Sequence, residues 1–303
     1  MARAFTSLSD TNGIQPLFSW YRRFGRSLPW RNINDPYGIF ISEVMLQQTQ
    51  VSRVLDFYPR FLKQFPDWES LAEAKTDALI RAWAGLGYNR RALYLRDAAR
   101  DVVAHGIPKT EEEWRRLKGI GPYAAAAIYT FVSRKPATAV DTNIRRVIGR
   151  YSLGILTPNP HDDARIRRRM KRLFPHTKDW VALHALMDLG SAICTSRKPS
   201  CEICPLRDAC KARSRFARGQ IAPTQMKTKE RIYSGKKFPD RIYRGRILSA
   251  LREQTSVSIL DIGKKIDATF ASEDQEWILR MIDRLHKDGF IKIKKDKLFL
   301  AKD

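Results

Sequence analysis

The spacing of apolar residues predicts a chain made mainly of helices. Apolar residues recur at three- and four-residue steps in 71–79 and 92–103, and 180–193 is apolar except for Asp188. That period is typical of helices with one face on a core. Asp35-Pro36 is expected to begin a further helix, because aspartate caps helix N-termini and proline fits the first turn.

Residues 117–141 (LKGIGPYAAAAIYTFVSRKPATAVD) predict two helices joined by a tight turn at Gly119-Ile120-Gly121. Glycine permits positive φ and leaves backbone N–H groups uncovered. Such groups at a helix N-terminus can bind phosphate. An ordinary helical hairpin with a glycine turn is the alternative. Asp141 precedes TNIRRVIGRY and is expected to cap that helix.

The last third of the chain has a different composition. From 211 to 246 basic residues dominate, with glycine, proline and threonine between them, which is typical of a linker. The stretch FIKIKKDKLFLA alternates apolar and polar residues and predicts a β-hairpin. The helices predicted before it are 243–253, 259–265 and 273–287. Three helices followed by a hairpin indicate a winged-helix-like module, with a generic α+β appendage as the alternative.

Charge and length narrow the class of protein. The formal net charge is +24 over 303 residues, which indicates a polyanionic partner and first of all nucleic acid. The length is typical of two domains. The sequence has no apolar run of about 18 residues and no signal-peptide pattern. We therefore expect a cytoplasmic protein, nucleoid-associated in a bacterium or archaeon, that acts as a monomer and has no membrane partner.

Glu43 is the only charged residue between Pro36 and Ser52. A carboxylate in such apolar surroundings loses solvation, which raises its pKa and favours the protonated form. A general acid working near neutral pH needs that property. The alternative is that Glu43 faces solvent on a polar stripe with Ser42, Gln47 and Gln50.

Tyr88 lies on a glycine turn, GLGY, and is followed closely by Arg90 and Arg91. An aromatic ring in this place could stack on a nucleic-acid base while the two arginines hold phosphate. A tyrosine packed in an ordinary loop is the alternative.

The four cysteines follow the pattern Cys194-x6-Cys201-x2-Cys204-x5-Cys210. Four thiols at such short spacing in an intracellular protein predict a four-thiolate metal site. The spacing alone leaves zinc and an iron–sulfur cluster open. Arg197 and Lys198 lie on the first loop of this site, so the metal could shape a basic loop for DNA.

Several motifs together resemble one family. LPWRNINDPYGIFISEVMLQQTQV, GLGYNRRALYL, LKGIGPYAAAAI, AVDTNIRRVIGRY and the four-cysteine loop resemble the helix-hairpin-helix DNA glycosylases, most closely the MutY adenine glycosylases. The resemblance covers about 28–210, and the QQT and GLGY stretches separate it from thymine glycosylases and endonuclease III. It implies a two-lobed helical fold with double-stranded DNA in the cleft, and a [4Fe-4S] cluster on the cysteines.

The resemblance also assigns roles to single residues. Glu43 matches the general acid that protonates the adenine, and Asp141 matches the carboxylate that stabilises or traps the oxocarbenium-like sugar. Tyr123 stands where many members carry a catalytic tyrosine and where endonuclease III carries its lysine. The remaining matches are the base pocket (Trp30, Arg31 and Asp188) and the DNA contacts (Gln48, Thr49, the wedge Tyr88, Gly119, Gly121, Arg197 and Lys198).

The sequence departs from the MutY pattern in four places. Asp188 stands where some members have a glutamate, the motif is VDTN instead of VDGN, and Asn89 replaces a tyrosine. The NUDIX-like C-terminal domain of MutY proteins, which recognises 8-oxoguanine, has no recognisable counterpart.

These observations predict a mainly α protein in three parts. A helix-hairpin-helix glycosylase domain covers 1–219, with a six-helix lobe at 36–150 and an iron–sulfur lobe made of the N-terminal segment and 151–219. A basic linker (220–242) and the winged-helix-like module (243–303) follow. The expected function is a monofunctional, base-flipping DNA glycosylase of base-excision repair that removes adenine opposite 8-oxoguanine or guanine. The alternatives are a T:G or U:G mismatch glycosylase, a bifunctional glycosylase/lyase, and a non-catalytic iron–sulfur DNA-binding protein.

Overall fold

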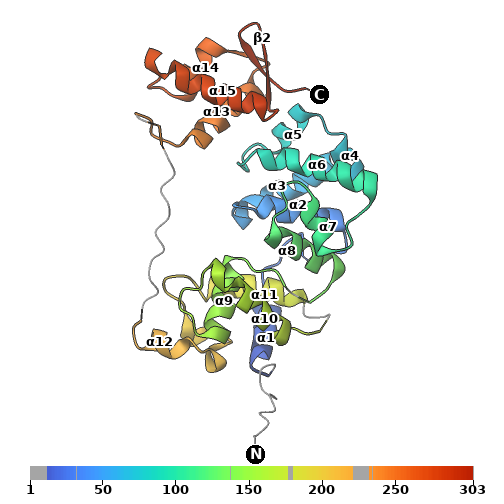
Figure 1. Cartoon of the computed structure of the whole chain (residues 1–303), viewed down its shortest axis with the longest axis vertical. Coiled ribbons are helices and arrows are strands. Elements are labelled where there is room, and N and C mark those ends of the chain that lie inside the picture. Colours follow the sequence, from blue (N-terminus) through green and yellow to red (C-terminus); the bar gives the residue numbers. More distant parts are fainter. Residues whose placement is uncertain are drawn as a thin grey trace, which may run out of the picture. The chain divides into compact units, whose positions relative to one another are not determined.

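The computed structural model describes residues 12–31, 33–136, 138–176, 180–220, 232–233 and 235–302. These residues are mainly helical, as the sequence predicts (Figure 1). The chain forms two compact units: Met1–Glu43, Pro108–Arg116 and Ile120–Met226 make the first, and the remaining segments make the second. The predicted domain boundaries at 219 and 242 stay a prediction, and residues 221–231 and 234 of the predicted linker lie outside the described residues.

The first unit contains the segments that precede and follow the glycine turn. Its α-helices are α1 (Gln15–Phe24), α2 (Pro36–Leu46, whose last turn enters the second unit), α7 (Glu111–Arg116), α8 (Pro122–Ser133), α9 (Thr142–Leu153), α10 (Asp163–Leu173), α11 (Val181–Ala192) and α12 (Arg213–Ala217). Short 3-10 helices lie at Asn12–Ile14, Pro160–Asp162, Cys201–Ile203 and Arg207–Ala209.

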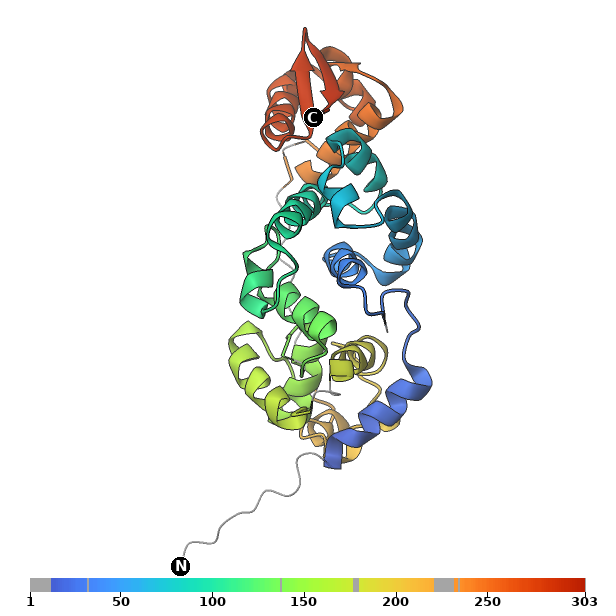
Figure 2. The same cartoon turned by 90° about the vertical axis from the view of Figure 1, so that its right-hand side faces the viewer.

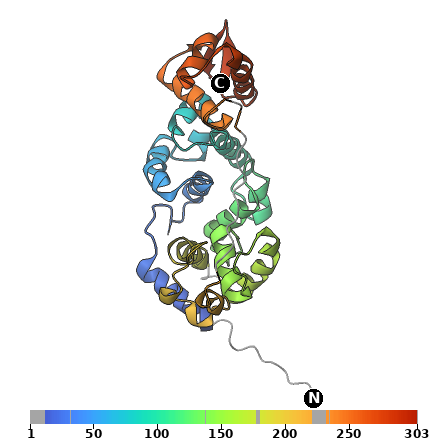
Figure 3. The same cartoon turned by 90° about the vertical axis from the view of Figure 1, so that its left-hand side faces the viewer.

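The core of the first unit lies where α1, α9, α10 and α11 come together (Figures 2 and 3). Fully buried side chains from each helix fill it, among them Leu17, Ile148, Met170 and Leu186. Gly190 allows α11 to pass close to α9, because a Cβ there would lie 2.7 Å from the Cβ of Asn143. This approach fixes the start of α9, which carries Asp141.

The local start signals read from the sequence are confirmed. Asp35 precedes α2 and its carboxylate accepts hydrogen bonds from the backbone N–H groups of Tyr37 and Gly38, at 3.0 and 2.8 Å. Asp141 is the N-cap of α9. At the glycine turn only Gly119 has a positive φ, of 82°, while Gly121 is the extended N-cap of α8.

The second unit contains α3 (Val51–Gln64), α4 (Trp68–Ala72), α5 (Thr76–Ala82) and α6 (Arg90–His105). The single helix predicted over 71–79 is wrong, because α4 and α5 are separate. Carbonyl groups in and before the break accept hydrogen bonds from α6: Arg100 Nε reaches the carbonyl of Ala72 at 2.9 Å and Arg96 Nη1 that of Ala74 at 3.0 Å. Both short helices bury their apolar residues, so the periodicity continues across the break.

The C-terminal module has three helices and a three-stranded antiparallel sheet in the order β1-β3-β2. Its elements are α13 (Asp240–Glu253), β1 (Val257–Ser258), α14 (Ile259–Ile266), a 3-10 turn (Ser272–Asp274), α15 (Gln275–Lys287), β2 (Ile291–Lys294) and β3 (Lys297–Leu300). This connectivity is that of a winged helix, with β2 and β3 as the wing (Figure 2). Lys295 and Asp296 have φ of 45° and 59°, as a type I′ hairpin turn requires.

The module shares its core with α5 inside the second unit. Ile80 is fully buried in the same apolar cluster as Tyr243 and Trp277. Arg90 of α6 pairs with Asp288 at the end of α15. The module therefore packs against α5 and α6.

Candidate active site

Three helix termini or turns of the first unit carry the predicted catalytic side chains. Glu43 lies in the last part of α2, Tyr123 in the first turn of α8, and Asp141 directly before α9. The three groups are near enough to affect one another's pKa. Residues separated by about a hundred positions are thus gathered in one place.

Glu43 is buried, with 8% of its surface exposed, so the solvent-facing alternative is wrong. Burial raises the pKa of its carboxyl from 4.5 to about 7, and the negative charge of Asp141 adds to the rise. The positive charge of Arg31 acts in the opposite direction. Glu43 is therefore a carboxylic acid that holds or releases its proton near neutral pH.

Asp141 is held in place by the helix it caps. Its Oδ1 accepts from the backbone N–H of Ile144 at 2.6 Å, and its Oδ2 accepts from Asn143 Nδ2 at 3.1 Å. Burial raises the pKa of this carboxyl, while the same hydrogen bonds oppose the rise because they favour the charged form. The carboxylate is thus oriented and partly desolvated.

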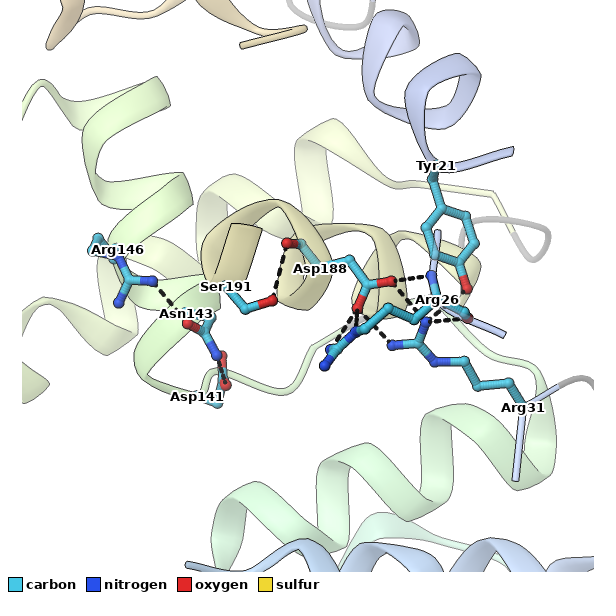
Figure 4. A network of polar contacts seen from close by, with 8 residues as sticks. All are labelled: Tyr21, Arg26, Arg31, Asp141, Asn143, Arg146, Asp188 and Ser191. Atoms are coloured by element: carbon cyan, nitrogen blue, oxygen red, sulfur yellow. Dashed lines mark hydrogen bonds and ion pairs between the residues drawn. The ribbon is translucent and has the colours of Figure 1, made fainter. Parts of the chain in front are cut away.

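The hydrogen bonds continue from Asp141 towards the cysteine loop (Figure 4). Asn143 Oδ1 accepts from Arg146 Nη2 at 2.7 Å, and Arg146 also donates to the carbonyl groups of Gly190 and Cys194, each at 2.6 Å. Arg146 and Asn143 were not singled out from the sequence. The available signal in the sequence was that they follow the expected helix cap Asp141 and lie three positions, or about one turn, apart.

Tyr123 is partly buried, and burial raises the pKa of its hydroxyl well above 10, with the charges of Glu43 and Asp141 adding to the rise. The hydroxyl is therefore neutral at physiological pH. It can donate a hydrogen bond, but it is not a ready nucleophile.

The predicted base-pocket residues form a buried ion-pair network (Figure 4). Asp188 accepts two parallel hydrogen bonds from Arg31, at 2.8 and 2.9 Å, and two more from Arg26, through its backbone N–H at 2.9 Å and its Nε at 2.7 Å. These bonds hold the pKa of Asp188 below its usual range against the effect of burial. Trp30, next to Arg31, is also buried.

Two further residues of this region were missed. Tyr21 Oη accepts from Arg31 at 3.3 Å, and the pKa of its hydroxyl is raised by burial. His184 packs with its ring centroid 4.2 Å from that of Phe131, and burial lowers the pKa of its imidazole to about 3. His184 is thus a neutral core residue, and a lone histidine on an apolar helix gave no clear signal of that.

The predicted wedge Tyr88 and the residues predicted to lie near the opposite strand, Gln48 and Thr49, belong to the second unit. Gln48 and Tyr88 are exposed and Thr49 is partly buried. The suggestion that the two arginines after Tyr88 hold phosphate is wrong for Arg91, because this side chain is buried and donates to backbone carbonyl groups. Arg90 is exposed but is paired with Asp288.

The remaining predicted DNA contacts are at the surface. Gly119, Gly121, Arg197 and Lys198 are all exposed. A Cβ on Gly119 would lie 2.5 Å from the ring of Tyr94, so this turn needs glycine for space as well as for its φ of 82°. Thr195 Oγ1 donates to the carbonyl of Lys198 at 2.6 Å and closes the first cysteine loop.

The four cysteines surround one apolar cavity. No three His, Cys, Asp or Glu side chains in the described parts of the chain lie together in a way that would hold a single metal ion. A zinc site needs four ligands about 2.3 Å from one point, whereas a cluster of several irons keeps its thiolates further apart around a volume. Four thiols around one apolar cavity fit an iron–sulfur cluster, to which all four cysteines would be the ligands.

Arg150 supports this loop from α9. It donates to the carbonyl groups of Thr195 and Ser196, each at 2.7 Å, and its Nη1 lies 3.5 Å from Cys194 Sγ. A cluster bound here would carry negative charge on its sulfurs, and the guanidinium provides a compensating positive charge.

A helical hairpin, a buried glutamate beside a capping aspartate and an iron–sulfur loop together define a class of DNA repair glycosylases. Residues 41–180 match the HhH-GPD superfamily of base excision DNA repair proteins, and residues 194–210 match the iron–sulfur binding domain of endonuclease III. The chain belongs to the adenine DNA glycosylase family within this superfamily. Its cofactor is a [4Fe-4S] cluster.

Relatives in two mycobacteria support the family assignment. The adenine DNA glycosylase of Mycobacterium tuberculosis is 37% identical over 251 residues, which cover 81% of this chain and 79% of the relative. That of Mycolicibacterium smegmatis is 33% identical over 294 residues, 93% of this chain and 94% of the relative. The second alignment covers so much of the chain that it must extend into the residues after 219.

Solved structures support the fold. A thermostable thymine-DNA glycosylase has a TM-score of 0.63 at 27% identity, covering 68% of this chain and 97% of that one. An endonuclease III in complex with DNA has a TM-score of 0.58 at 18% identity, covering 70% and 99%. In the described part of the chain, no helix is long and apolar enough to cross a membrane.

Proposed function

We propose that this protein removes adenine opposite 8-oxoguanine or guanine in double-stranded DNA by hydrolysing the N-glycosidic bond, and that it acts as a monomer. The observation that carries the proposal is the pair of carboxyl groups: Glu43, buried and with a pKa of about 7, and Asp141, partly buried and oriented by the helix it caps. The choice of adenine as the base that is removed rests on the relatives, which are named adenine DNA glycosylases.

Glu43 supplies the proton in this reaction. Near neutral pH a substantial fraction of Glu43 is protonated, so it can donate to a ring nitrogen of a flipped purine. Protonation turns the base into a neutral leaving group. The electron pair of the glycosidic bond goes to the base, and positive charge develops on the sugar.

Asp141 stabilises that charge. Its carboxylate is fixed by Ile144 and Asn143 and needs no reorganisation when the sugar becomes positive. The two carboxyl groups thus divide acid and charge-stabilising roles as they do in glycoside hydrolysis. Water completes the reaction at the sugar carbon.

Cleavage of the strand after base removal is expected to be weak. A lyase needs an amine that forms a Schiff base with the sugar, and the residue after Pro122 is Tyr123. Lys118, in the other unit, is paired with Asp97 at 2.9 Å. Borohydride should therefore trap little covalent enzyme–DNA adduct.

The wing of the C-terminal module is proposed to bind DNA phosphates. Lys294 and Lys297 are directly opposite each other on β2 and β3, and both are exposed. Like charges in this position repel each other, so the pair is favourable only with an anion between or beside them. The face of α15 is less suited to this task, because its Arg280 and Lys287 are paired with Glu276 and Asp283.

A single-turnover assay on matched duplexes tests the proposal. The substrates carry A:8-oxoG, A:G, T:G, U:G and A:T, and base release is measured with the full chain carrying its cluster. We expect release of adenine from the first two. Thymine release from T:G is the second candidate, favoured by the 27% identity to the thymine-DNA glycosylase. Release of thymine without adenine would reject the proposal in favour of that candidate.

A further inference from the structure

Two surface loops of the second unit carry residues in an uncommon backbone conformation. Gln48, after α2, has φ of 55°, and Tyr88, on the glycine turn before α6, has φ of 47°. Residues other than glycine rarely adopt this left-handed region unless the surrounding structure holds them there. Both are exposed, and both are residues that the family resemblance assigns to DNA contact. Something in the fold must therefore hold these two loops.

Arg91 is the side chain that connects both loops. Its Nη1 donates to the last turn of α2 and to the loop after it, at the carbonyl groups of Val44 (2.9 Å), Met45 (2.9 Å) and Gln47 (2.5 Å). Its Nη2 donates to Thr49 Oγ1 (3.0 Å) and to the glycine turn at the carbonyl groups of Leu86 (3.2 Å) and Gly87 (3.1 Å). One guanidinium thus contacts the residues on both sides of Gln48 and the two residues before Tyr88.

The guanidinium is also fixed from its faces. Its central carbon lies 5.2 Å from the ring centroid of Trp83 and 5.7 Å from that of Tyr88. Arg91 is 7% exposed, and burial lowers the pKa of its guanidinium to about 10, so it remains charged at neutral pH. Only a planar group with several donors in a fixed fork can serve so many acceptors; a lysine ammonium has three donors at one point.

We propose that Arg91 is a positioning residue that makes the loop of Gln48 and Thr49 and the turn of Tyr88 one rigid element. When the contacts of Gln48 and Thr49 with the base opposite the target change, the position of the wedge Tyr88 then changes with them. Recognition of the opposite base and flipping of the target nucleotide are coupled through this side chain. The inference rests on the proposed function, because these two loops have this role only in a protein that binds DNA and removes a base from it.

The same helix provides a matched control. Arg96 of α6 is 8% exposed and donates through Nη1 to the carbonyl of Ala74 at 3.0 Å and to Thr76 Oγ1 at 2.9 Å. These two bonds hold the segment between α4 and α5 and the first residue of α5. Arg91→Lys and Arg96→Lys each replace a buried guanidinium on α6 by an ammonium and keep the positive charge. The two variants should therefore lower the melting temperature by similar amounts.

The experiment compares the wild-type protein and the two variants, each with its cluster and full chain. Two quantities are measured: the A:8-oxoG to A:G ratio of single-turnover rates, and the rate at which 2-aminopurine next to the target adenine becomes fluorescent as the base flips. Arg91→Lys should lower the ratio about fivefold and slow the fluorescence change about tenfold, since small misplacements cost such factors. Arg96→Lys should leave both within about twofold of wild type.

The outcomes separate this inference from the proposed function. A wild-type protein that releases no adenine rejects the proposed function. A wild-type protein that is active, with Arg91→Lys affected no more than Arg96→Lys, rejects only the coupling.

If Arg91→Lys does not fold, the exposed residues Gln48 and Tyr88 provide a second test. The effects of Gln48→Ala and Tyr88→Ala on the rate ratio should then differ from simple multiplication by at least about threefold in the double variant. Simple multiplication would reject the coupling.

Discussion

Arg31 and Asp188 face each other as a parallel two-bond ion pair although 157 positions separate them in the sequence. Both side chains are buried, and Arg26 occupies the remaining acceptor positions of the carboxylate. A carboxylate so fully engaged is better suited to holding two arginines at the pocket than to reading a base. Some family members have glutamate at this position. The shorter aspartate fits the structural role, because both of its oxygens accept hydrogen bonds from the arginines.

We predict that Asp188→Asn destabilises the protein by about 3 kcal/mol, because it leaves the buried charge of Arg31 uncompensated. Denaturant unfolding at pH 7 measures the effect. Asp163→Asn is the control: Asp163 makes a comparable two-bond pair with Arg145, but both are more exposed, so the cost should be about 1 kcal/mol or less. Equal costs for the two variants would contradict the assignment of Asp188 to a buried structural pair.

Glu43→Gln should abolish base release and stabilise the protein at high pH. Because burial raises the pKa of Glu43 from 4.5 to about 7, its contribution to stability is full below pH 4.5 and is lost as the pH rises to about 7. Glutamine has no such loss. The variant should therefore gain on wild type by up to about 3 kcal/mol between pH 4.5 and pH 8.

Denaturant unfolding of both proteins across this pH range measures that gain. Glu112→Gln, on the exposed face of α7, controls for removal of a surface carboxylate and should change stability little. A gain that does not depend on pH would contradict the buried acid.

Asp141→Asn should also abolish base release, but with little change in stability. Asparagine is as good an N-cap as aspartate, so the bond to Ile144 can persist, whereas Asp141→Ala should cost about 1 kcal/mol. Removal of the negative charge at 141 should also lower the pKa of Glu43, because that charge contributes to raising it. The Glu43→Gln comparison repeated in the Asp141→Asn background should show a smaller gain at pH 8. An unchanged gain would mean that the two carboxyl groups do not interact.

The protein purified in air should contain about four irons per chain and be yellow-brown, as a [4Fe-4S] cluster implies. Iron analysis and visible absorption measure this. Cys204→Ser should reduce the iron content strongly, because it removes a thiolate from the cavity. Stoichiometric zinc without visible absorption would be incompatible with the cluster.

The wing is tested by Lys294→Ala combined with Lys297→Ala. The slope of log affinity against log salt should become shallower by up to about 2, since each phosphate contact contributes about 0.9. The A:8-oxoG to A:G rate ratio should not change. Lys264→Ala, an exposed lysine in the last turn of α14, is the control for removal of a basic charge from the same module. A collapse of the ratio with an unchanged salt slope would make the wing a lesion reader instead of a phosphate contact.

Features that depend on neighbours in the sequence could be predicted from it. Asp35 and Asp141 cap helices through bonds to residues two or three positions away, so a short motif contains the whole interaction. The four cysteines are close in sequence and converge in a single loop. The apolar surroundings of Glu43 left two interpretations open, burial or a place on a solvent-facing polar stripe, and the structure shows burial.

The tertiary structure decided what those groups face. The sequence could indicate that Glu43 is buried, but its interaction with the charge of Asp141 depends on how α2 and α9 pack. The family resemblance assigned Asp188 to the base pocket, and the place of Arg91 after the glycine turn indicated a phosphate contact. In the folded chain, Asp188 is paired with two arginines from the N-terminal segment, and Arg91 donates to carbonyl groups at the end of α2 and in two loops. Such partners are determined by packing between distant segments, which no local pattern contains.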